Sequence, residues 1–292
     1  MKLALSGQVL AGTHSLEEIL KIMSSYGVNA IEIWPGNVPA LEENVCADAY
    51  EGRDALAAKR VLDQYGFTVS GVSMSAAFHS EISADLDRYA AALVRAVEVA
   101  ETLGTKLVNH YCYNLSLAIM PDLARIKRAV MPAVQLAEKL GIVLCLENEA
   151  HDATRTPEGM LSIIEAISSP SFKTNYDPTN YYHAAEEGFP YAYDLLKPHI
   201  AYVHLKNGCV YRPELGHSEL SKGSVMTGAL APNHIYYPPL PEGVVNIDGV
   251  LARLKRDGYE GYCVIEPHTK PELAQHYFAT ETAYVRERGY FY

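Results

Sequence analysis

Short apolar runs alternate along the chain with longer stretches in which apolar residues return every three or four positions. The first pattern is typical of buried β-strands and the second of amphipathic α-helices. The apolar runs predict eight strands, at residues 2–5, 28–34, 67–74, 105–111, 142–147, 172–177, 200–205 and 259–266. Because strands and helices alternate, we expect the strands to run parallel.

The helix boundaries recur as well. Ser15 and Glu18 form a capping box, Thr156 precedes a proline at a helix start, and Asn246 can cap a later helix. Glycines suited to a left-handed helix end precede five predicted strands, at Gly27, Gly66, Gly104, Gly141 and Gly258. Repeated strand–helix units in a chain of this size predict an α/β fold, a single-domain (β/α)8 barrel over residues 1–292. An open doubly wound sheet is the alternative, but the first predicted strand lacks its usual GxGxxG turn.

One stretch interrupts the repeat, at residues 208–245, directly after the seventh predicted strand. It holds five prolines and several tyrosines and shows no regular apolar period. A loop of this length inside a compact domain is commonly functional. Two interpretations stay open: a mobile lid over the adjacent strand end, or a homo-oligomer contact or plain surface insertion.

Four predicted strands end in an acidic or imidazole side chain, namely Glu147, Asp177, His204 and Glu266. In a barrel of parallel strands the carboxyl ends meet at one rim, where such folds keep their active sites. Three carboxylates and one imidazole suit a divalent cation, and Mn, Mg, Co and Zn all accept such ligands. The sequence therefore predicts one metal site at this rim.

Side chains two positions further along a strand share the face of these ligands. This alternation predicts an upper layer above the metal, facing the substrate. Glu32 ends the second predicted strand and is expected at the same rim. Substrate contacts are expected from Glu149, Lys206, His268, His110 and Trp34. Trp34 also suits a hydrophobic wall, and His110 a hydrogen-bonded position in the core.

Composition narrows the choice of partners. The net charge of −11 repels a phosphate backbone, which argues against nucleic acid. The five cysteines form no CxxC pair, as in a protein of a reducing compartment, and we expect a cytoplasmic location. No apolar run approaches the ~20 residues of a membrane span. The expected partner is thus a small molecule.

Four segments carry a resemblance: LEN at 146–148, YDPTN at 176–180, YVHLKN at 202–207 and VIEP at 264–267. They resemble matching segments of the xylose isomerase-like barrel superfamily, which groups sugar isomerases and epimerases, inosose dehydratases and type IV apurinic endonucleases. The resemblance spans nearly the whole chain. Three positions depart from the common pattern: Asn180 stands where relatives often carry His, Asn207 where Asp is common, and Glu149 where many carry His or a neutral residue.

The resemblance implies a role for each strand-end residue. In ketose 3-epimerases of the superfamily, the residues matching Glu147, Asp177, His204 and Glu266 bind a divalent ion, often manganese. The two glutamates also exchange the substrate proton, so Glu147 and Glu266 are the expected catalytic residues. The chemistry agrees, because removing a C–H proton beside a carbonyl needs a polarising cation, with a base and an acid on opposite faces.

The predicted function is a divalent-metal-dependent isomerase or epimerase of a small sugar or polyol ketone, acting through an enediolate. A dehydratase of an inosose-like keto-polyol is the alternative, because the same site could remove a proton and expel a hydroxyl. A phosphodiester hydrolase is disfavoured by Asn180 and by the net charge. A non-catalytic sugar-binding barrel is disfavoured by the complete set of metal ligands.

Overall fold

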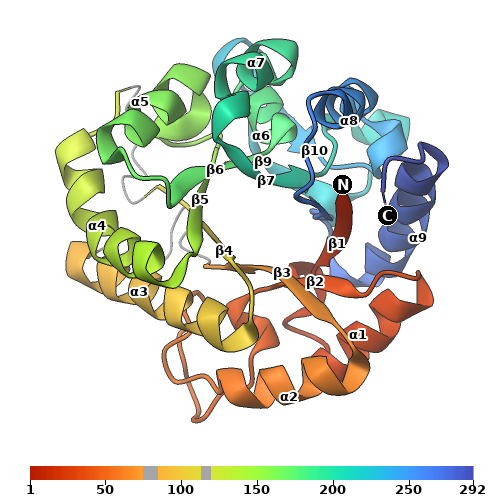
Figure 1. Ribbon diagram of the computed structural model, residues 1–292. Helices are drawn as coiled ribbons and strands as arrows, with labels where there is room; N and C mark the ends of the chain where they lie inside the picture. The colour runs from red at the N-terminus through yellow and green to blue at the C-terminus, as the bar shows by residue number, and fades with distance from the viewer. Residues whose placement is uncertain (75–84, 113–119, 292) are drawn as a thin grey trace.

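Eight parallel strands close into a barrel in the computed structural model, which describes residues 1–74, 85–112 and 120–291 (Figure 1). The strands follow one another around the ring in the order β1-β11-β7-β6-β5-β4-β3-β2. The predicted (β/α)8 barrel is therefore confirmed. The barrel strands are β1 (Lys2–Ser6), β2 (Ala30–Ile33), β3 (Thr68–Ser73), β4 (Leu107–His110), β5 (Val143–Glu147), β6 (Phe172–Tyr176), β7 (Ile200–Leu205) and β11 (Tyr262–Ile265).

The helices form an outer ring around these strands (Figure 1). Their bounds are α1 (Leu16–Ser25), α2 (Ala55–Tyr65), α3 (Leu86–Leu103), α4 (Leu123–Leu140), α5 (Pro157–Ile167), α6 (Pro178–His183), α7 (Tyr193–Leu196), α8 (Ile247–Arg256) and α9 (Pro271–Glu287). The predicted caps at Ser15, Thr156 and Asn246 each accept a hydrogen bond from the first helical turn. Within the described ranges, no helix has both the length and the apolar character needed to cross a membrane.

The inside of the barrel is filled in layers, as in other barrels of this kind. The lower layer is apolar and includes Ala4, Ala30, Cys145, Tyr202 and Val264, all buried. Moving two positions along each of these five strands leads to a buried polar side chain, namely Ser6, Glu32, Glu147, His204 and Glu266. The candidate site therefore rests directly on a packed floor.

The segment after β7 folds into a small sheet of its own. Strands β8 (Cys209–Val210), β9 (Lys222–Val225) and β10 (His234–Tyr236) pair antiparallel in the order β8-β10-β9. Tyr277 of α9 ties the sheet to the barrel, because its hydroxyl donates to the carbonyl of Tyr237 at 2.6 Å and lies 2.8 Å from Ser221 Oγ. The inserted segment is thus anchored by specific contacts.

Asn207 joins the two ends of the insertion. Its side-chain amide donates to the carbonyls of Leu240 and Val245 at 2.7 and 3.2 Å, and its oxygen accepts from the amide of Val245 at 2.9 Å. An aspartate could accept the last bond but could not donate the first two. This requirement gives a physical reason for asparagine at a position where the superfamily commonly carries aspartate.

We expect Asn207→Asp to destabilise the closure of the insertion. The substitution places a buried carboxylate against two carbonyl oxygens and should cost about 1–3 kcal/mol or more. Urea unfolding and the rate of proteolytic cutting within residues 208–245 measure the effect. Asn233→Asp is the matched control, because Asn233 donates to the carbonyl of Leu230 at 2.8 Å but is exposed. Equal stability and cutting in the two variants would contradict the role given to Asn207.

Candidate metal centre

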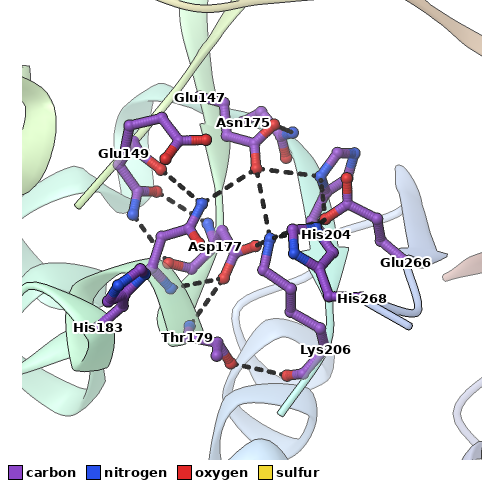
Figure 2. Close-up of polar contacts among 12 residues, drawn as sticks. Glu147, Glu149, Asn175, Asp177, Thr179, His183, His204, Lys206, Glu266 and His268 are labelled. Atoms are coloured by element: carbon purple, nitrogen blue, oxygen red, sulfur yellow. Dashed lines mark hydrogen bonds and ion pairs between the residues drawn. The ribbon is translucent and has the colours of Figure 1, made fainter. Parts of the chain in front are cut away.

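The four predicted ligands converge at the carboxyl-terminal rim of the barrel (Figure 2). One potential ligand atom from each of Glu147, Asp177, His204 and Glu266 lies within 4.8 Å of all the others. All four side chains are buried, with residue exposures of 0–1%. The closed sheet thus brings Glu147 and Glu266 together, although they stand 119 positions apart in the sequence.

Asp177 uses its two oxygens differently. Oδ1 accepts from the backbone amides of Thr179 and Asn180 at 2.8 and 2.9 Å and so caps α6. Oδ2 faces the cluster and lies 2.7 Å from Lys206 Nζ, an ion pair without hydrogen-bond geometry. The helix cap therefore holds the carboxylate with one oxygen directed at the candidate site.

Glu147 is surrounded by side-chain amides. Its Oε2 accepts from Asn109 and Asn175 at 2.9 and 3.3 Å, and its Oε1 accepts from Asn180 at 3.2 Å. Burial raises the pKa of Glu147, but attraction to His204 and Lys206, together with the hydrogen bond to His204, outweighs it and leaves the pKa below its usual value. The amides stabilise the carboxylate form and fix its orientation.

Lys206 lies within the ligand set rather than above it (Figure 2). Its Nζ is 2.8 Å from Glu266 Oε2 and 3.8 Å from Glu147 Oε1, in addition to its contact with Asp177. Burial lowers the pKa of Lys206, but the carboxylates, Asp177 first, raise it well above its usual value. Lys206 follows His204 by two positions on β7, as predicted for an upper layer, but this layer is not separate from the ligands, because Nζ reaches their carboxylates.

A stagger of the strands is visible in their pairing. Glu147 pairs with Asn175, whereas Tyr176 pairs with Val203, so that Asp177 comes level with His204. His204 in turn pairs with Val264, which brings Lys206 level with Glu266. The register of the tilted strands therefore shifts by two positions between Glu147 and Asp177 and by two more between His204 and Glu266, which keeps the four ligands at one rim and places Lys206 beside Glu266.

His204 is enclosed by carboxylates. Its Nδ1 lies 3.2 Å from Glu147 Oε1 and 3.3 Å from Glu266 Oε2, while its Nε2 lies 2.9 Å from Glu32 Oε1. Burial lowers the pKa of His204, but the three glutamates raise it well above its usual value. For Glu266, burial raises the pKa, and attraction to His204, Lys206 and His268 brings it well below the usual range.

These charges fit a divalent cation. Four buried carboxylates, from Glu32 and the three acidic ligands, contact two positively charged side chains, His204 and Lys206. Buried charges without compensation are costly. A dication among the ligand atoms would offset most of the remaining negative charge, and carboxylate and imidazole donors suit it.

The other predicted site residues differ in how close they come to the cluster. His268 Nε2 lies 3.2 Å from Glu266 Oε2 and 3.4 Å from Lys206 Nζ. Glu149 is half-buried nearby, and burial together with Glu147 raises its pKa well above the usual value. Trp34 is buried, and its indole donates to Ser6 Oγ and Glu32 Oε2.

His110 points away from the cluster. Its Nδ1 lies 3.0 Å from the hydroxyl of Tyr89 on α3, and its ring packs edge-on against Phe172. Burial lowers the pKa of His110 to about 4. Its neighbour Asn109 takes the inward position instead, so the structure does not bring His110 together with the ligands.

Sequence reasoning missed the amides of Asn109 and Asn175. Asn175 shares strand parity with Asp177, and Asn109 shares parity with the apolar Leu107 on β4. These two features could have identified them as inward-facing.

A cavity of about 430 Å³ lies beside the cluster. Tyr237 of the insertion and His268 line it, together with Gln8, Lys222, Thr269 and Lys270. His268 therefore borders the cavity while contacting Glu266 and Lys206. This cavity is open to solvent and lined by polar and apolar side chains, it adjoins the candidate metal centre through His268, and it is large enough for a small substrate.

Asp152, a buried carboxyl outside the ligand set, supports the turn after β5. Asp152 Oδ1 accepts from the amide and the hydroxyl of Thr154 at 2.7 and 2.6 Å. Thr154 Oγ in turn accepts from the amide of Glu149 at 2.8 Å. Asp152 Oδ2 has no hydrogen-bond partner within the part of the chain that the structure describes, and burial raises the pKa of Asp152 to about 7.

With the geometry established, comparison with known proteins identifies the family. A family model described as xylose isomerase-like TIM barrel matches residues 20–288. The chain belongs to the xylose isomerase-like TIM barrel family. The resemblance carried by its strand-end segments is thereby confirmed. A comparison with curated proteins gives no match.

Solved members of this fold are similar over nearly their whole length. The probable 3-DHS dehydratase AsbF from Bacillus anthracis has a TM-score of 0.70 at 17% identity, with 99% of this chain and 100% of that chain covered. D-allulose 3-epimerase from Methylomonas sp. in complex with D-allulose has a TM-score of 0.68 at 17% identity, with 99% and 97% covered. A xylose isomerase-like TIM barrel protein from Mycobacterium smegmatis in complex with magnesium has a TM-score of 0.67 at 18% identity, with 95% and 88% covered. At these identities the similarity shows the fold, and the reaction must be argued from the site.

We expect Asp152→Asn to change the pH dependence of stability. The folded-state pKa of Asp152, about 7, lies above its unfolded value of about 3.9. The folded protein therefore binds this proton more tightly, and that stabilisation is complete below about pH 4 and is lost as the pH rises through about 7. The asparagine variant has no such proton to lose. Its free energy of unfolding, relative to that of wild type, should therefore increase by up to about 4 kcal/mol as the pH rises from about 4 to about 7.

Urea unfolding at several pH values measures this difference. Asp122→Asn is the control, because Asp122 is an exposed cap of α4 whose amide replacement retains an accepting oxygen. A difference between Asp152→Asn and wild type that stays constant from pH 4 to 7 would contradict the titration assigned to Asp152.

Proposed function

We propose that this chain is a divalent-metal-dependent isomerase or epimerase of a small keto sugar or keto polyol. The observation that carries the proposal is the buried convergence of four ligand atoms within 4.8 Å of one another at the rim of the barrel. Similarity to D-allulose 3-epimerase supports the reaction class, since that protein is solved in complex with a ketose. Family membership supports an enzyme.

Glu147, Asp177, His204 and Glu266 would hold the ion. Manganese is the ion we favour, and magnesium, cobalt and zinc suit the same donors. When bound, the ion supplies positive charge that polarises a carbonyl and acidifies the neighbouring C–H bond. The binding and proton-transfer steps then fall to side chains of the barrel.

Glu147 is the proposed acid and Glu266 the proposed base. This assignment follows from the contacts that each carboxylate makes. Both oxygens of Glu147 accept amide hydrogen bonds, so neither oxygen is free of a protein partner. The contacts of Glu266 with His204, Lys206 and His268 all involve Oε2. Oε1 of Glu266 is therefore the oxygen available to a substrate. We assign proton removal to Oε1 of Glu266. Proton return from the opposite face is assigned to Glu147 after it has taken up a proton from solvent, and Glu266 then releases its proton to solvent, which restores the starting state.

Lys206, His268 and Glu149 are the proposed substrate-binding residues. Lys206 and His268 can hold substrate oxygens beside Glu266, and the cavity of about 430 Å³ lined by His268 can receive the rest of the molecule. The raised pKa of Glu149 favours a neutral carboxyl that can donate a hydrogen bond to a hydroxyl. His110 is left out of this set because Nδ1 contacts Tyr89 and the ring packs against Phe172, and Trp34 because its indole N–H contacts Ser6 and Glu32.

A dehydratase is the second candidate, and one contact favours it. His268 lies within 3.2 Å of Glu266 Oε2 and 3.4 Å of Lys206 Nζ, so a group able to give a proton to a departing hydroxyl stands beside the proposed base. The similarity to the probable 3-DHS dehydratase AsbF supports this reading.

Metal analysis of the purified protein, followed by a screen of ketoses and inososes, tests the function. The protein is stripped with a chelator and reloaded with manganese before each assay. Mass spectrometry of the product separates the candidates, because an epimerase conserves mass and a dehydratase loses water. A protein that binds no divalent ion would exclude both.

We expect Asp177→Asn to lose the ion while keeping the fold. Asparagine can still cap α6 but lacks the charge. Metal affinity should fall by more than about 100-fold, since loss of a residue that only hydrogen-bonds to a metal ligand already costs about 10–100-fold. Glu147→Gln should retain some metal and lose turnover. Calorimetric titration with Mn²⁺ measures affinity, and Glu149→Gln, outside the four-ligand set, serves as the affinity control. Normal turnover by Glu147→Gln would remove Glu147 from proton transfer.

Turnover in heavy water should place deuterium on the carbon next to the carbonyl. The reason is that a carboxylate that removes a proton can exchange it with solvent before proton return. NMR of the recovered sugar measures the label, with the same sugar incubated with chelated enzyme as the control. Direct transfer of a labelled hydrogen between adjacent carbons, with no solvent label, would indicate a hydride shift instead.

A further inference from the structure

His204 is held from both sides of its ring. Nδ1 faces the ligand set, at 3.2 Å from Glu147 Oε1 and 3.3 Å from Glu266 Oε2. Nε2 faces the opposite way and lies 2.9 Å from Glu32 Oε1. Nδ1 is thus the nitrogen positioned to ligate, and Nε2 is the nitrogen that donates to Glu32.

Glu32 is neither one of the four ligands nor one of the proposed substrate-binding residues. It is fully buried on β2, and the imidazole ring stands between its carboxylate and the ligand atoms. In the described part of the chain, its one ionic partner is His204. A buried carboxylate is costly, so its retention at this point calls for a partner that depends on it.

Two donors fix the orientation of this carboxylate. Ser73 Oγ donates to Oε1 at 2.8 Å, the same oxygen that contacts His204. Trp34 Nε1 donates to Oε2 at 2.9 Å and also lies 2.8 Å from Ser6 Oγ. An indole N–H can only donate, so Oε2 must remain an acceptor. Strands β1, β2 and β3 thereby support one carboxylate aimed at one imidazole nitrogen.

We propose that Glu32, aligned by Trp34, is a positioning residue that keeps the proton of His204 on Nε2 and so presents Nδ1 as a free metal ligand. The inference rests on the proposed metal centre and adds the residue pair that sets its imidazole. Metal-ligating histidines commonly donate their second N–H to a carboxylate, and loss of such a partner costs about 10–100-fold in metal affinity.

Trp34 limits how a glutamine at position 32 can be oriented. In Glu32→Gln the side chain has one accepting oxygen and one donating nitrogen. If the nitrogen faces His204, it opposes the proton on Nε2. If it faces Trp34, it opposes the indole N–H at 2.9 Å. Either orientation sets two donors against each other, and removal of the indole N–H relieves the second.

The experiment compares four variants with wild type: Glu32→Gln, Trp34→Phe, the double variant, and Glu281→Gln as the matched control. Glu281 is also a fully buried glutamate, but it contacts the backbone amide of Leu240, far along the chain from β2. Calorimetric titration with Mn²⁺ gives affinities, circular dichroism monitors folding, and ¹⁵N NMR of the Zn²⁺-loaded protein locates the proton of His204.

We expect affinity to fall about 10–100-fold in Glu32→Gln and to stay near wild type in Glu281→Gln. The double variant should bind more tightly than Glu32→Gln, by about threefold or more, because its amide oxygen can turn to Nε2–H without opposing an indole. A merely structural role would give additive losses and no such recovery. The NMR spectrum of loaded wild type should show the proton on Nε2.

Three results overturn the inference. They are unchanged affinity in Glu32→Gln, a double variant weaker than Glu32→Gln, or a loaded wild type with the proton on Nδ1. Each of them leaves the metal-dependent function standing, because wild type still binds the ion. Absence of Mn²⁺ and Zn²⁺ binding to wild type would instead reject the proposed function and this inference together.

Discussion

Buried negative charge at the mouth of the barrel is the constraint on which the rest of the site depends. Glu32, Glu147, Asp177 and Glu266 are all buried, and each would be costly alone. Asparagine amides, a helix cap, an indole and two cations each stabilise part of this charge. Each of these polar side chains is thus a partner to one of the carboxylates, and the negative charge that they leave uncompensated suits a dication.

Strand ends and their faces could be predicted from the sequence because both depend on local patterns. A short apolar run that ends in Glu or His identifies the end of a buried strand, and alternation identifies the inward face. Height along the axis is different, because it depends on how each strand pairs with its neighbours. Lys206 follows His204 by two positions and was expected above the metal layer. The pairing of β7 with β11 places it beside Glu266, and its Nζ reaches that carboxylate.

Strand alternation alone does not tell which of two adjacent polar residues on a short strand faces into the barrel. In β4, Asn109 and His110 are adjacent polar residues, and one of them must face outward. His110 is the more reactive side chain and was the natural candidate for the mouth. The structure directs it to Tyr89 between β4 and α3 and gives the inward position to Asn109, whose amide can donate to Glu147. The deciding factor is complementarity with a carboxylate on β5, 38 positions away, which no local pattern records.

The end of β7 connects the metal centre to the insertion that follows it. His204 and Lys206 face the ligands, and Asn207, the next residue, clamps Leu240 and Val245 at the far end of the insertion. Gly243 leaves room for this clamp, since a Cβ there would lie 2.2 Å from the Asn207 amide. Tyr237, between the clamped ends, lines the cavity with His268. His204, Lys206 and Asn207 thus lie within one segment of four residues, which links the candidate cation site to the insertion that forms one wall of the cavity.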